Sequence, residues 1–334
     1  MYQLYVYPVK SFRPVELSSA IVTKHGFEHD RRFMLLQRLE DGSLKNMHVA
    51  YYPAMVRFFT SLDFVEDGEV KGAVITVTWK PARGEAKTLK IPLVPDTDDL
   101  ELIDVKMHNS PTKAFDMGSK YNDWLSECLG YAVVLAYLGN NTRPVLMSTD
   151  GEKGAAGSWI SSVTSHLPAA IGGLIHEEEK RITFADCAPY LVVSDKSMED
   201  VSNKLPDGEE MDIEKFRPNI IVSDAERPWE EDYWAELTLG KTKLLLRQNC
   251  ARCQSINIDF ATGEPGTGEA GKMLKKMQSN RRVDAGAKYK PIFGRYAFLD
   301  SESQGETISI GDEVFVTQRN VERTRFDWPG LSTK

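Results

Sequence analysis

Short strand-like runs recur along the whole chain, and this recurrence constrains the fold more than any other feature. In the first hundred residues, alternating or β-branched runs lie at 2–7, 15–23, 32–37, 74–79 and 89–93. Later runs lie at 131–138, 190–193, 219–222, 235–239, 243–247, 255–259, 296–299 and 314–318. Too few helical stretches separate these runs for a doubly wound parallel sheet. The sequence therefore predicts a mainly β (α+β) protein with a few covering helices.

Three segments have the pattern of a helix. Ser119 is expected to cap the first helix, which has an apolar face and a stop signal at Gly130. Shorter helices are expected around residues 197–205 and 273–278. The pair Asp41-Gly42 is typical of a hairpin turn and follows the strand-like run at 33–39.

The regular pattern breaks between residues 139 and 181. This stretch contains the glycine-rich run at 151–157, the pair Gly172-Gly173 and an acidic run at 177–179. We predict one β domain over residues 1–138, an irregular connector or lid over 139–181, a second β domain over 182–320 and a tail over 321–334. The sequence leaves open whether the middle segment is a lid or only a connector.

Composition limits the classes of protein that this chain can belong to. The chain has 334 residues, 41% of them hydrophobic and 27% charged, which is typical of a globular protein. Its formal net charge of −8 argues against general binding to nucleic acid, which requires a basic face. Four cysteines are too few for a disulfide scaffold of this size, so we expect a reduced intracellular protein. We also expect no targeting segment and no membrane span.

The pair Cys250 and Cys253 is the strongest chemical feature, and its spacing alone leaves several alternatives open. Structural zinc would need two further ligands, and the sequence has no second CxxC. A thioredoxin-like site would begin a helix, whereas the residues that follow are expected to be extended. An inert structural pair is the remaining alternative.

A glycine-rich motif downstream imitates a phosphate-binding loop. Residues 266–272 match its first part and lead into a helical stretch, but Met273 stands where the magnesium-binding hydroxyl would be. Glu264 and Glu269 would also repel a triphosphate. We therefore interpret this motif as a surface loop.

Cationic residues gather at the ends of several predicted strands. Lys10 and Ser11 end the first strand, the pair Arg31-Arg32 precedes another, and Arg217 and Asn219 precede a third. Arg252 adjoins Cys253 and favours its thiolate form. Guanidinium groups bind phosphate in a bidentate way, and lysine adds a compact charge. We interpret Lys10, Arg32, Arg217 and Arg252 as a site for an anionic ligand that carries a metal.

At these residues the sequence resembles the MOSC-domain family, and within it the members that reduce amidoximes. The resemblance follows the order Tyr-Pro-Val-Lys-Ser, Asp-Arg-Arg-Phe, Phe-Arg-Pro-Asn-Ile and Cys-Ala-Arg-Cys along nearly the whole chain. It implies an N-terminal MOSC-associated β-barrel domain and a MOSC β-barrel, with the molybdenum cofactor (molybdenum-molybdopterin) between them.

The resemblance also implies roles for individual residues. Cys253 matches the cysteine that ligates molybdenum, and Cys250 does not. The positions that match contacts to the pterin and its phosphate are Lys10, Ser11, Arg32, Arg217, Asn219 and Arg252, with His108 as a weaker match. In residues 186–189, Cys187 and Ala188 replace hydroxyl residues that lie near the cofactor in the family.

The activity implied is the two-electron reduction of N-hydroxylated compounds such as amidoximes and hydroxylamines, with oxygen removed at molybdenum. Because the chain has no haem or iron–sulfur signature, electrons are expected from separate proteins. The resemblance implies cytochrome b5 and its NADH-dependent reductase as these donors. We expect a monomer in the mitochondrion or cytoplasm. The alternatives are a cofactor carrier or sulfur-transfer module without such turnover, and a β-barrel interaction protein with no cofactor.

Overall fold

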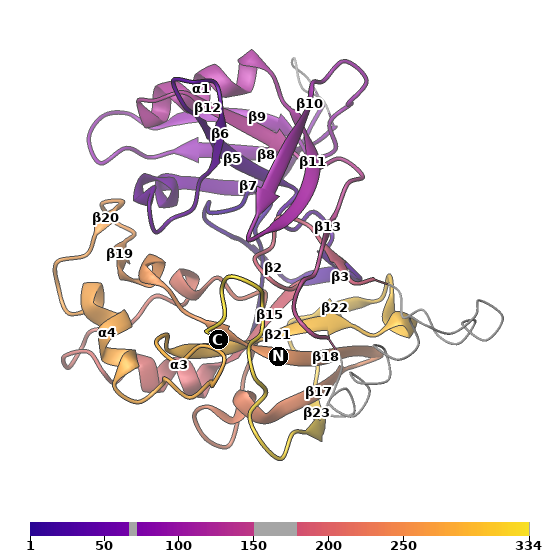
Figure 1. Ribbon diagram of the computed structural model, residues 1–334, viewed down its shortest axis with the longest axis vertical. Coiled ribbons are helices and arrows are strands. Elements are labelled where there is room, and N and C mark those ends of the chain that lie inside the picture. The colour runs from indigo at the N-terminus through magenta and orange to yellow at the C-terminus, as the bar shows by residue number, and fades with distance from the viewer. Residues whose placement is uncertain (67–71, 150–178, 334) are drawn as a thin grey trace, which may run out of the picture.

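The structure is a computed structural model that describes residues 1–66, 72–149 and 179–333. The prediction of a mainly β chain is confirmed, since strands dominate and only three α-helices occur among the described residues. Figure 1 shows two units, an upper one built from the indigo-to-magenta part of the chain and a lower one built mostly from the orange and yellow part.

The upper unit contains two antiparallel sheets and one helix. The first sheet has the order β10-β11-β12-β5-β6 and the second the order β7-β8-β9. The strands of the first sheet are β5 (Phe33–Arg38), β6 (Leu44–Asn46), β10 (Leu102–Met107), β11 (Ser110–Asp116) and β12 (Val133–Tyr137). Those of the second are β7 (Phe58–Val65), β8 (Gly72–Trp79) and β9 (Lys87–Pro92). Helix α1 (Ser119–Leu129) packs on β12 and β9.

One apolar core joins the two sheets and the helix, and a second cluster includes the alternate residues Met34 and Leu36 of β5. Alternate residues of the strands, such as Phe33, Leu35 and Ile75, are fully buried in the first core. Phe12 enters the same core and stacks on Phe58 with ring centroids 4.4 Å apart. Burial of each such side chain contributes about 1.5–3 kcal/mol to the free energy of folding, so this core stabilises the upper unit.

The lower unit is organised around one eight-stranded sheet of order β2-β1-β16-β15-β21-β18-β17-β23. Its strands are β1 (Gln3–Val6), β2 (Val15–Leu17), β15 (Tyr190–Ser194), β16 (Ile220–Val222), β17 (Trp234–Leu239), β18 (Thr242–Ala251), β21 (Ile292–Leu299) and β23 (Val314–Arg319). Among the described strands of this sheet, β15 and β16 pair in parallel and the other neighbours pair antiparallel. Helices α3 (Asp195–Ser202) and α4 (Met273–Gln278) lie beside the sheet.

Short strands and 3-10 turns complete the fold. The strands are β3 (Ser19–Thr23), β4 (Gly26–Phe27), β13 (Arg143–Pro144), β14 (Arg181–Ile182), β19 (Ile258–Asp259), β20 (Glu264–Pro265) and β22 (Thr307–Ser309). The 3-10 turns are η1 (Pro53–Arg57), η2 (Ile213–Phe216), η3 (Glu230–Tyr233), η4 (Gln254–Asn257), η5 (Ala270–Lys272) and η6 (Ser301–Ser303).

The first strands of the chain lie in sheets completed by its second half. Strand β1 pairs with β16, and β3 pairs with β22. The chain then enters the upper unit through Lys10, whose backbone amide donates to Phe33 O at 2.8 Å. Residues 7–32 therefore connect the two units, and the expected boundary at residue 138 divides segments that share one sheet.

Several local predictions differ from the structure. The run at 15–23 is two strands, and β7, β10 and β11 were not predicted. Ser119 is the first residue of α1 rather than its cap, and Asp116 instead accepts hydrogen bonds from Gly118 N and Asn122 Nδ2 at this end. The predicted stop at Gly130 is confirmed by its left-handed backbone, φ 81°.

The middle segment is described only at its ends. There β13 and β14 pair with each other, at Arg143–Pro144 and Arg181–Ile182. The glycine-rich run at 151–157, the Gly172-Gly173 pair and the choice between lid and connector lie outside the described residues. Within the described ranges, no helix is long and apolar enough to cross a membrane.

Candidate functional site

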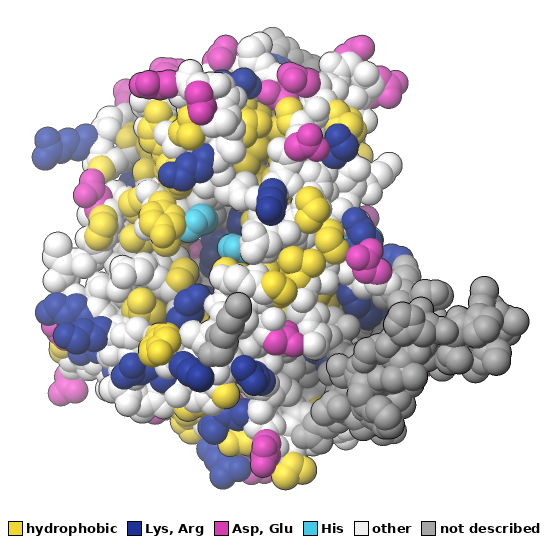
Figure 2. Space-filling view, viewed as in Figure 1, with side chains coloured by type: hydrophobic (Ala, Val, Ile, Leu, Met, Phe, Trp, Pro, Cys, Tyr) yellow, Lys and Arg dark blue, Asp and Glu magenta, His cyan; other side chains and the backbone are white. Residues whose placement is uncertain are grey.

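Four loops meet at a cavity where the upper unit rests on the eight-stranded sheet. Three of these loops end or begin a strand of that sheet, and the fourth, which carries Arg31, joins β4 to β5. In Figure 2, histidine side chains border a hollow at this level, with Lys or Arg side chains inside it. The polar residues and cysteines lining the cavity are Arg31, Asp186, Arg217, Asn219, Cys250, Arg252, Cys253, Ser255 and Tyr296.

Tyr7 holds two of the arginines in place. The guanidinium groups of Arg31 and Arg217 lie 4.4 and 4.3 Å from the centroid of its ring, and the phenol OH donates to Pro218 O at 3.1 Å. Arg31 also donates to Asn219 Oδ1 at 3.0 Å and pairs with Asp30. Such contacts fix the orientation of a guanidinium group before any ligand arrives.

Two guanidinium groups at the cavity keep buried nitrogen atoms without a hydrogen-bond partner. These atoms are Nη2 of Arg217 and Nε of Arg252. Burial lowers the pKa of Arg217 to about 10 because the charge is removed from water. A buried charged donor without an acceptor is costly, so these atoms indicate a place for an anion.

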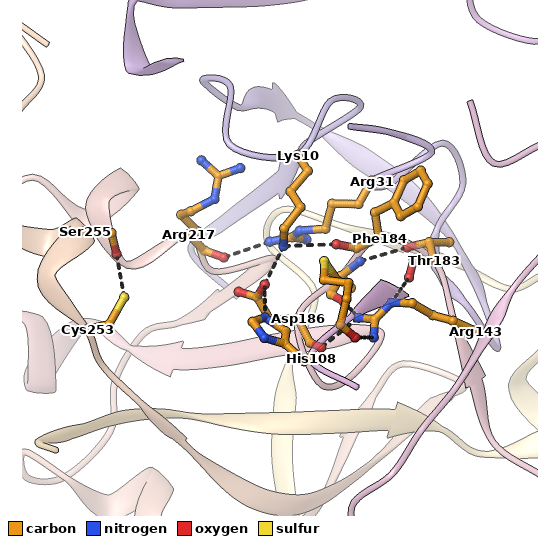
Figure 3. A network of polar contacts seen from close by, with 12 residues as sticks. Lys10, Arg31, His108, Arg143, Thr183, Phe184, Asp186, Arg217, Cys253 and Ser255 are labelled. Carbon is orange, nitrogen blue, oxygen red and sulfur yellow. Dashed lines mark hydrogen bonds and ion pairs between the residues drawn. The ribbon is translucent and has the colours of Figure 1, made fainter. Parts of the chain in front are cut away.

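Lys10, Asp186 and His108 form a second polar group beside the cavity (Figure 3). Lys10 is buried, and its Nζ donates to Asp186 Oδ1 and to Phe184 O. His108 Nε2 lies 3.4 Å from the same carboxylate oxygen. Burial would raise the pKa of Asp186, but Lys10 and His108 hold it well below its usual range. The carboxylate is therefore ionised and orients both basic groups.

The two cysteines of the CxxC motif lie in different environments. Cys250 is buried in β18, donates to Tyr296 OH at 3.3 Å and accepts from Arg252 Nη1 at 2.9 Å. Burial raises the pKa of its thiol. Cys253 is exposed, and its Sγ lies 3.2 Å from Ser255 Oγ. Only Cys253 is thus available to a ligand in the open part of the cavity.

The residues after Cys253 are not extended as expected. They form η4, a 3-10 turn that begins directly after Cys253, and only Ile258–Asp259 is a strand. The glycine-rich loop downstream does not form a phosphate cradle, since Lys272 Nζ pairs with Glu269 at 2.8 Å and α4 begins only at Met273.

Left-handed backbone conformations are concentrated at this site. Ser11, Arg31, His108 and Arg217 all have φ between 50° and 72°, a region that non-glycine residues rarely adopt. Such conformations cost about 1–3 kcal/mol each and persist where the surroundings impose them. The fold therefore imposes these backbone positions next to the cavity.

The structure brings together most of the residues expected from the sequence. Arg217, Asn219, Arg252 and Cys253 line the cavity, while Lys10 and His108 reach it through Asp186. Ser11 is buried in the adjoining turn.

Arg32 lies elsewhere. Its Nη2 donates to Gly139 O at the start of the middle segment, and its neighbour Arg31 lines the cavity instead.

Two further residues were not singled out from the sequence. Asp186 stands in the 186–189 segment, whose expected hydroxyl groups are replaced, so that segment was the available signal. Arg143 is fully buried and supports the segment by donating to Thr183 O at 2.9 Å and to Asp186 O at 2.7 Å. Nothing in the local sequence distinguishes Arg143 from a surface arginine.

The donor set fits the molybdenum cofactor that the resemblance implies. No group of three His, Cys, Asp or Glu side chains that could hold a metal lies within the described ranges. A pterin dithiolene would bring further sulfur ligands for a metal bound at Cys253. The unpartnered atoms of Arg217 and Arg252 suit the cofactor's phosphate, and Arg252 lies beside Cys253.

Comparisons with known proteins agree with this architecture. The family model described as the MOSC N-terminal beta barrel domain matches residues 1–132, and that of the MOSC domain matches residues 179–315. The chain is 25% identical to mitochondrial amidoxime-reducing component 1 of Mus musculus and 24% identical to that of Homo sapiens, over 94% of this chain and 81% and 82% of those proteins. It is also 24% identical to molybdenum cofactor sulfurase of Arabidopsis thaliana, over 92% of this chain and 34% of that protein.

Proposed function

The chain belongs to the MOSC-domain family, and from that premise we propose that it is a molybdenum-cofactor-dependent reductase of N-hydroxylated compounds. Amidoximes and hydroxylamines are the proposed substrates. An amidoxime would take up two electrons and two protons and leave as an amidine and water. The names of the mouse and human relatives support this reaction class.

One observation carries the proposal: a cavity with an exposed thiol also holds two buried guanidinium groups with unpartnered nitrogen atoms. Burial of a cation without a nearby anion destabilises a protein by roughly several kcal/mol unless a ligand supplies the negative charge. A thiolate and a phosphate-binding pair in one cavity suit a ligand that has a soft metal at one end and a phosphate at the other.

The roles of the chain's own residues follow from their contacts. Cys253 would hold the metal, and Arg217 and Arg252 would hold the phosphate. Asn219 and Tyr7 keep Arg31 and Arg217 in place, and Asp186 keeps Lys10 directed at the cavity. When bound, the cofactor supplies a metal that can change its oxidation state by two electrons and accept oxygen.

The two protons that the reaction consumes need a route from water. His108 Nε2 lies 3.4 Å from Asp186 Oδ1 at the edge of the cavity, where an imidazole can pass a proton between water and the site. With 56% of the Asp186 side chain exposed, this pair is in contact with solvent. We propose His108 as the residue that delivers protons to the site.

Electrons must come from outside the chain in this proposal. The sequence has no haem or iron–sulfur signature that would supply them internally. We propose cytochrome b5 and its NADH-dependent reductase as the donors.

The test combines metal analysis with an activity assay. Protein purified from a cofactor-competent host should contain one molybdenum per chain and should reduce benzamidoxime with a chemical electron donor. Cys253→Ala should lose both the metal and the turnover, whereas Cys250→Ala, the matched control, should retain most of both. Wild-type protein with neither molybdenum nor turnover would refute the proposal, and the reverse result for the two cysteines would refute the ligand assignment.

A second candidate function is a cofactor carrier or sulfur-transfer module. The exposed thiol of Cys253 and the similarity to a molybdenum cofactor sulfurase support it. This chain spans only about a third of that sulfurase. A persulfide detected on Cys253 by mass spectrometry, with bound molybdenum but no turnover of benzamidoxime, would favour this second function.

A further inference from the structure

The segment from α4 to the start of β21 presents a basic surface on an acidic protein. Its exposed or half-exposed cations are Lys275, Arg282, Lys288 and Lys290, which we call the basic face. In Figure 2, Lys and Arg side chains form a band across the lower unit, below the hollow with the histidines. The chain as a whole carries a formal net charge of −8, so this gathering of cations runs against its overall charge.

Both ends of this segment are attached beside Cys253. At one end, Leu274 N of α4 donates to Asn257 Oδ1 of η4 at 2.9 Å, and η4 begins directly after Cys253. At the other end, Arg252 N donates to Pro291 O at 2.8 Å, one residue beyond Lys290. The segment is also held together internally, because Gln278 Nε2 donates to Tyr289 O at 3.1 Å. The basic face thus adjoins the thiol end of the cavity.

The described structure shows no ion pair at any of the four cations of the basic face. Within the described ranges, none of the four has a carboxylate within ion-pair distance, whereas neighbouring Lys272 and Lys276 share Glu269, each at 2.8 Å. Tyr289 lies among them with 69% of its surface exposed. Exposed tyrosines are enriched at protein–protein interfaces, and cations without a carboxylate partner remain available to an acidic protein.

We propose that the basic face is the docking surface for a small acidic electron-carrier protein. This inference rests on the proposed function, because a reductase whose electrons come from outside needs a docking place near its metal. Charge complementarity would draw an acidic carrier to the one part of this surface that adjoins Cys253, while the acidic remainder repels it. Each encounter would pass one electron and release the oxidised carrier, so that two encounters supply one turnover.

The test uses full-length, cofactor-loaded protein and the soluble haem domain of cytochrome b5 as the acidic carrier. One variant combines Lys275→Glu, Arg282→Glu and Lys288→Glu. The matched control combines Lys90→Glu, Lys106→Glu and Lys241→Glu, three exposed lysines away from this segment. Both sets change the net charge equally, so any difference between them reports position. Calorimetry measures binding of the carrier, and benzamidoxime turnover with a chemical donor is measured separately.

We expect the first variant to bind the haem domain about tenfold more weakly at low ionic strength, with the difference shrinking as salt is added. The control and the wild type should bind it equally, and all three should turn over equally with the chemical donor. Three results would each overturn the docking surface. The first variant could bind the haem domain as tightly as the wild type does, or the control could weaken binding as much as the first variant does. The wild type could also bind the haem domain no more tightly than it binds the basic carrier cytochrome c. Loss of turnover with the chemical donor in the wild type would instead count against the proposed function, and the binding data would still decide the docking surface.

Discussion

Arg281 and Arg217 are both buried arginines of the lower unit, yet their surroundings differ in one respect. Nη2 of Arg281 donates to both carboxylate oxygens of Asp232, at 2.8 and 3.0 Å, and Arg323 donates to the same carboxylate at 2.8 Å. Arg217 has Tyr7 and the carbonyl of Phe12 as neighbours, and its Nη2 has no partner. The charge of Arg281 is balanced within the fold, and that of Arg217 is not.

This difference distinguishes Arg281, whose charge has partners within the fold, from Arg217, whose charge is left for a ligand. Around Arg281, the acids Glu230, Glu231 and Asp232 come from one 3-10 turn, η3, and the cations come from later loops. Near Arg217 the acids are Asp30 and Asp186, and they already pair with Arg31 and Lys10. A buried cluster that lacks anions is expected to acquire one from a ligand.

The largest loss of stability is expected at Arg281, whose charge is balanced by a buried carboxylate. Arg281→Met would leave the buried carboxylate of Asp232 with Arg323 alone, at a cost of about 3–5 kcal/mol in the free energy of unfolding. Urea denaturation measures this loss. The control Arg319→Met breaks the pair with Glu230, at 3.0 Å, and should cost less than Arg281→Met because 46% of the Arg319 side chain is exposed to solvent. Equal losses in the two variants would contradict the comparison.

At the unbalanced cluster, the effect should fall on ligand binding rather than on folding. Arg217→Met removes an uncompensated buried charge, so the cofactor-free protein should lose no stability and should gain some. Charged hydrogen bonds to the phosphate contribute about 1.5–3 kcal/mol, so molybdenum content should fall about tenfold or more. Arg38→Met, at a half-exposed pair with Asp116, is the control and should keep its molybdenum. Metal analysis and urea denaturation are both needed. If the role of Arg217 were merely structural, the variant would lose stability as well as molybdenum.

A third experiment examines the remaining acid of the balanced cluster. Glu231 is buried and accepts hydrogen bonds from Ser194 and Ser197, and its burial raises its pKa to about 7. Because the pKa is higher in the folded state, the stability from this group is fully present below about pH 4.5 and is lost as the pH rises through about 7.

Glu231→Gln keeps the hydrogen bonds without the charge. We expect this variant to exceed the wild type by about 1–3 kcal/mol at pH 8 and to match it near pH 4.5. Unfolding midpoints measured across this range provide the check. A constant difference at every pH would show that Glu231 does not titrate there.

The smallest effect is expected at Asp186. Its pKa is depressed in the folded state, so its contribution is present above about pH 4 and is lost as the pH falls through the lower folded value. Because 56% of its side chain is exposed, solvent screens the pair with Lys10, and Asp186→Asn should cost about 1 kcal/mol or less at pH 7. The difference in the free energy of unfolding between the wild type and Asp186→Asn should vanish in acid. A difference that grows below pH 4 would contradict the lowered pKa of Asp186.

Much of the fold was predictable because strand patterning is local. The runs that became β1, β5, β8, β15 and β21 alternate or are β-branched, and the helix over 273–278 was predicted with the bounds that the structure has. The missed strands β7, β10 and β11 have many exposed residues, so their apolar pattern is weak. The cap at Ser119 failed because Asp116, a residue outside the helix, satisfies that end.

The candidate site was predictable in its residue types but not in its contacts. Cations at strand ends and a cysteine beside Arg252 are visible in the sequence. The choice between Arg31 and Arg32 is not, because it depends on the left-handed backbone of Arg31, φ 50°, which the surrounding loops impose. The use of Cys253 rather than Cys250 follows from the burial of β18, where Tyr296 and Arg252 occupy the Cys250 thiol.

By its own periodicity, then, the sequence determined that this chain forms short strands with few helices, since side-chain alternation is a property of neighbouring residues. It also determined that cations stand where those strands end. Only the tertiary structure decided which of these cations keep an unpartnered nitrogen. That outcome depends on contacts between residues about 200 positions apart, such as Arg217 with Tyr7 and Phe12. Electrostatic balance is a property of the assembled cavity, and no single segment of the chain contains it.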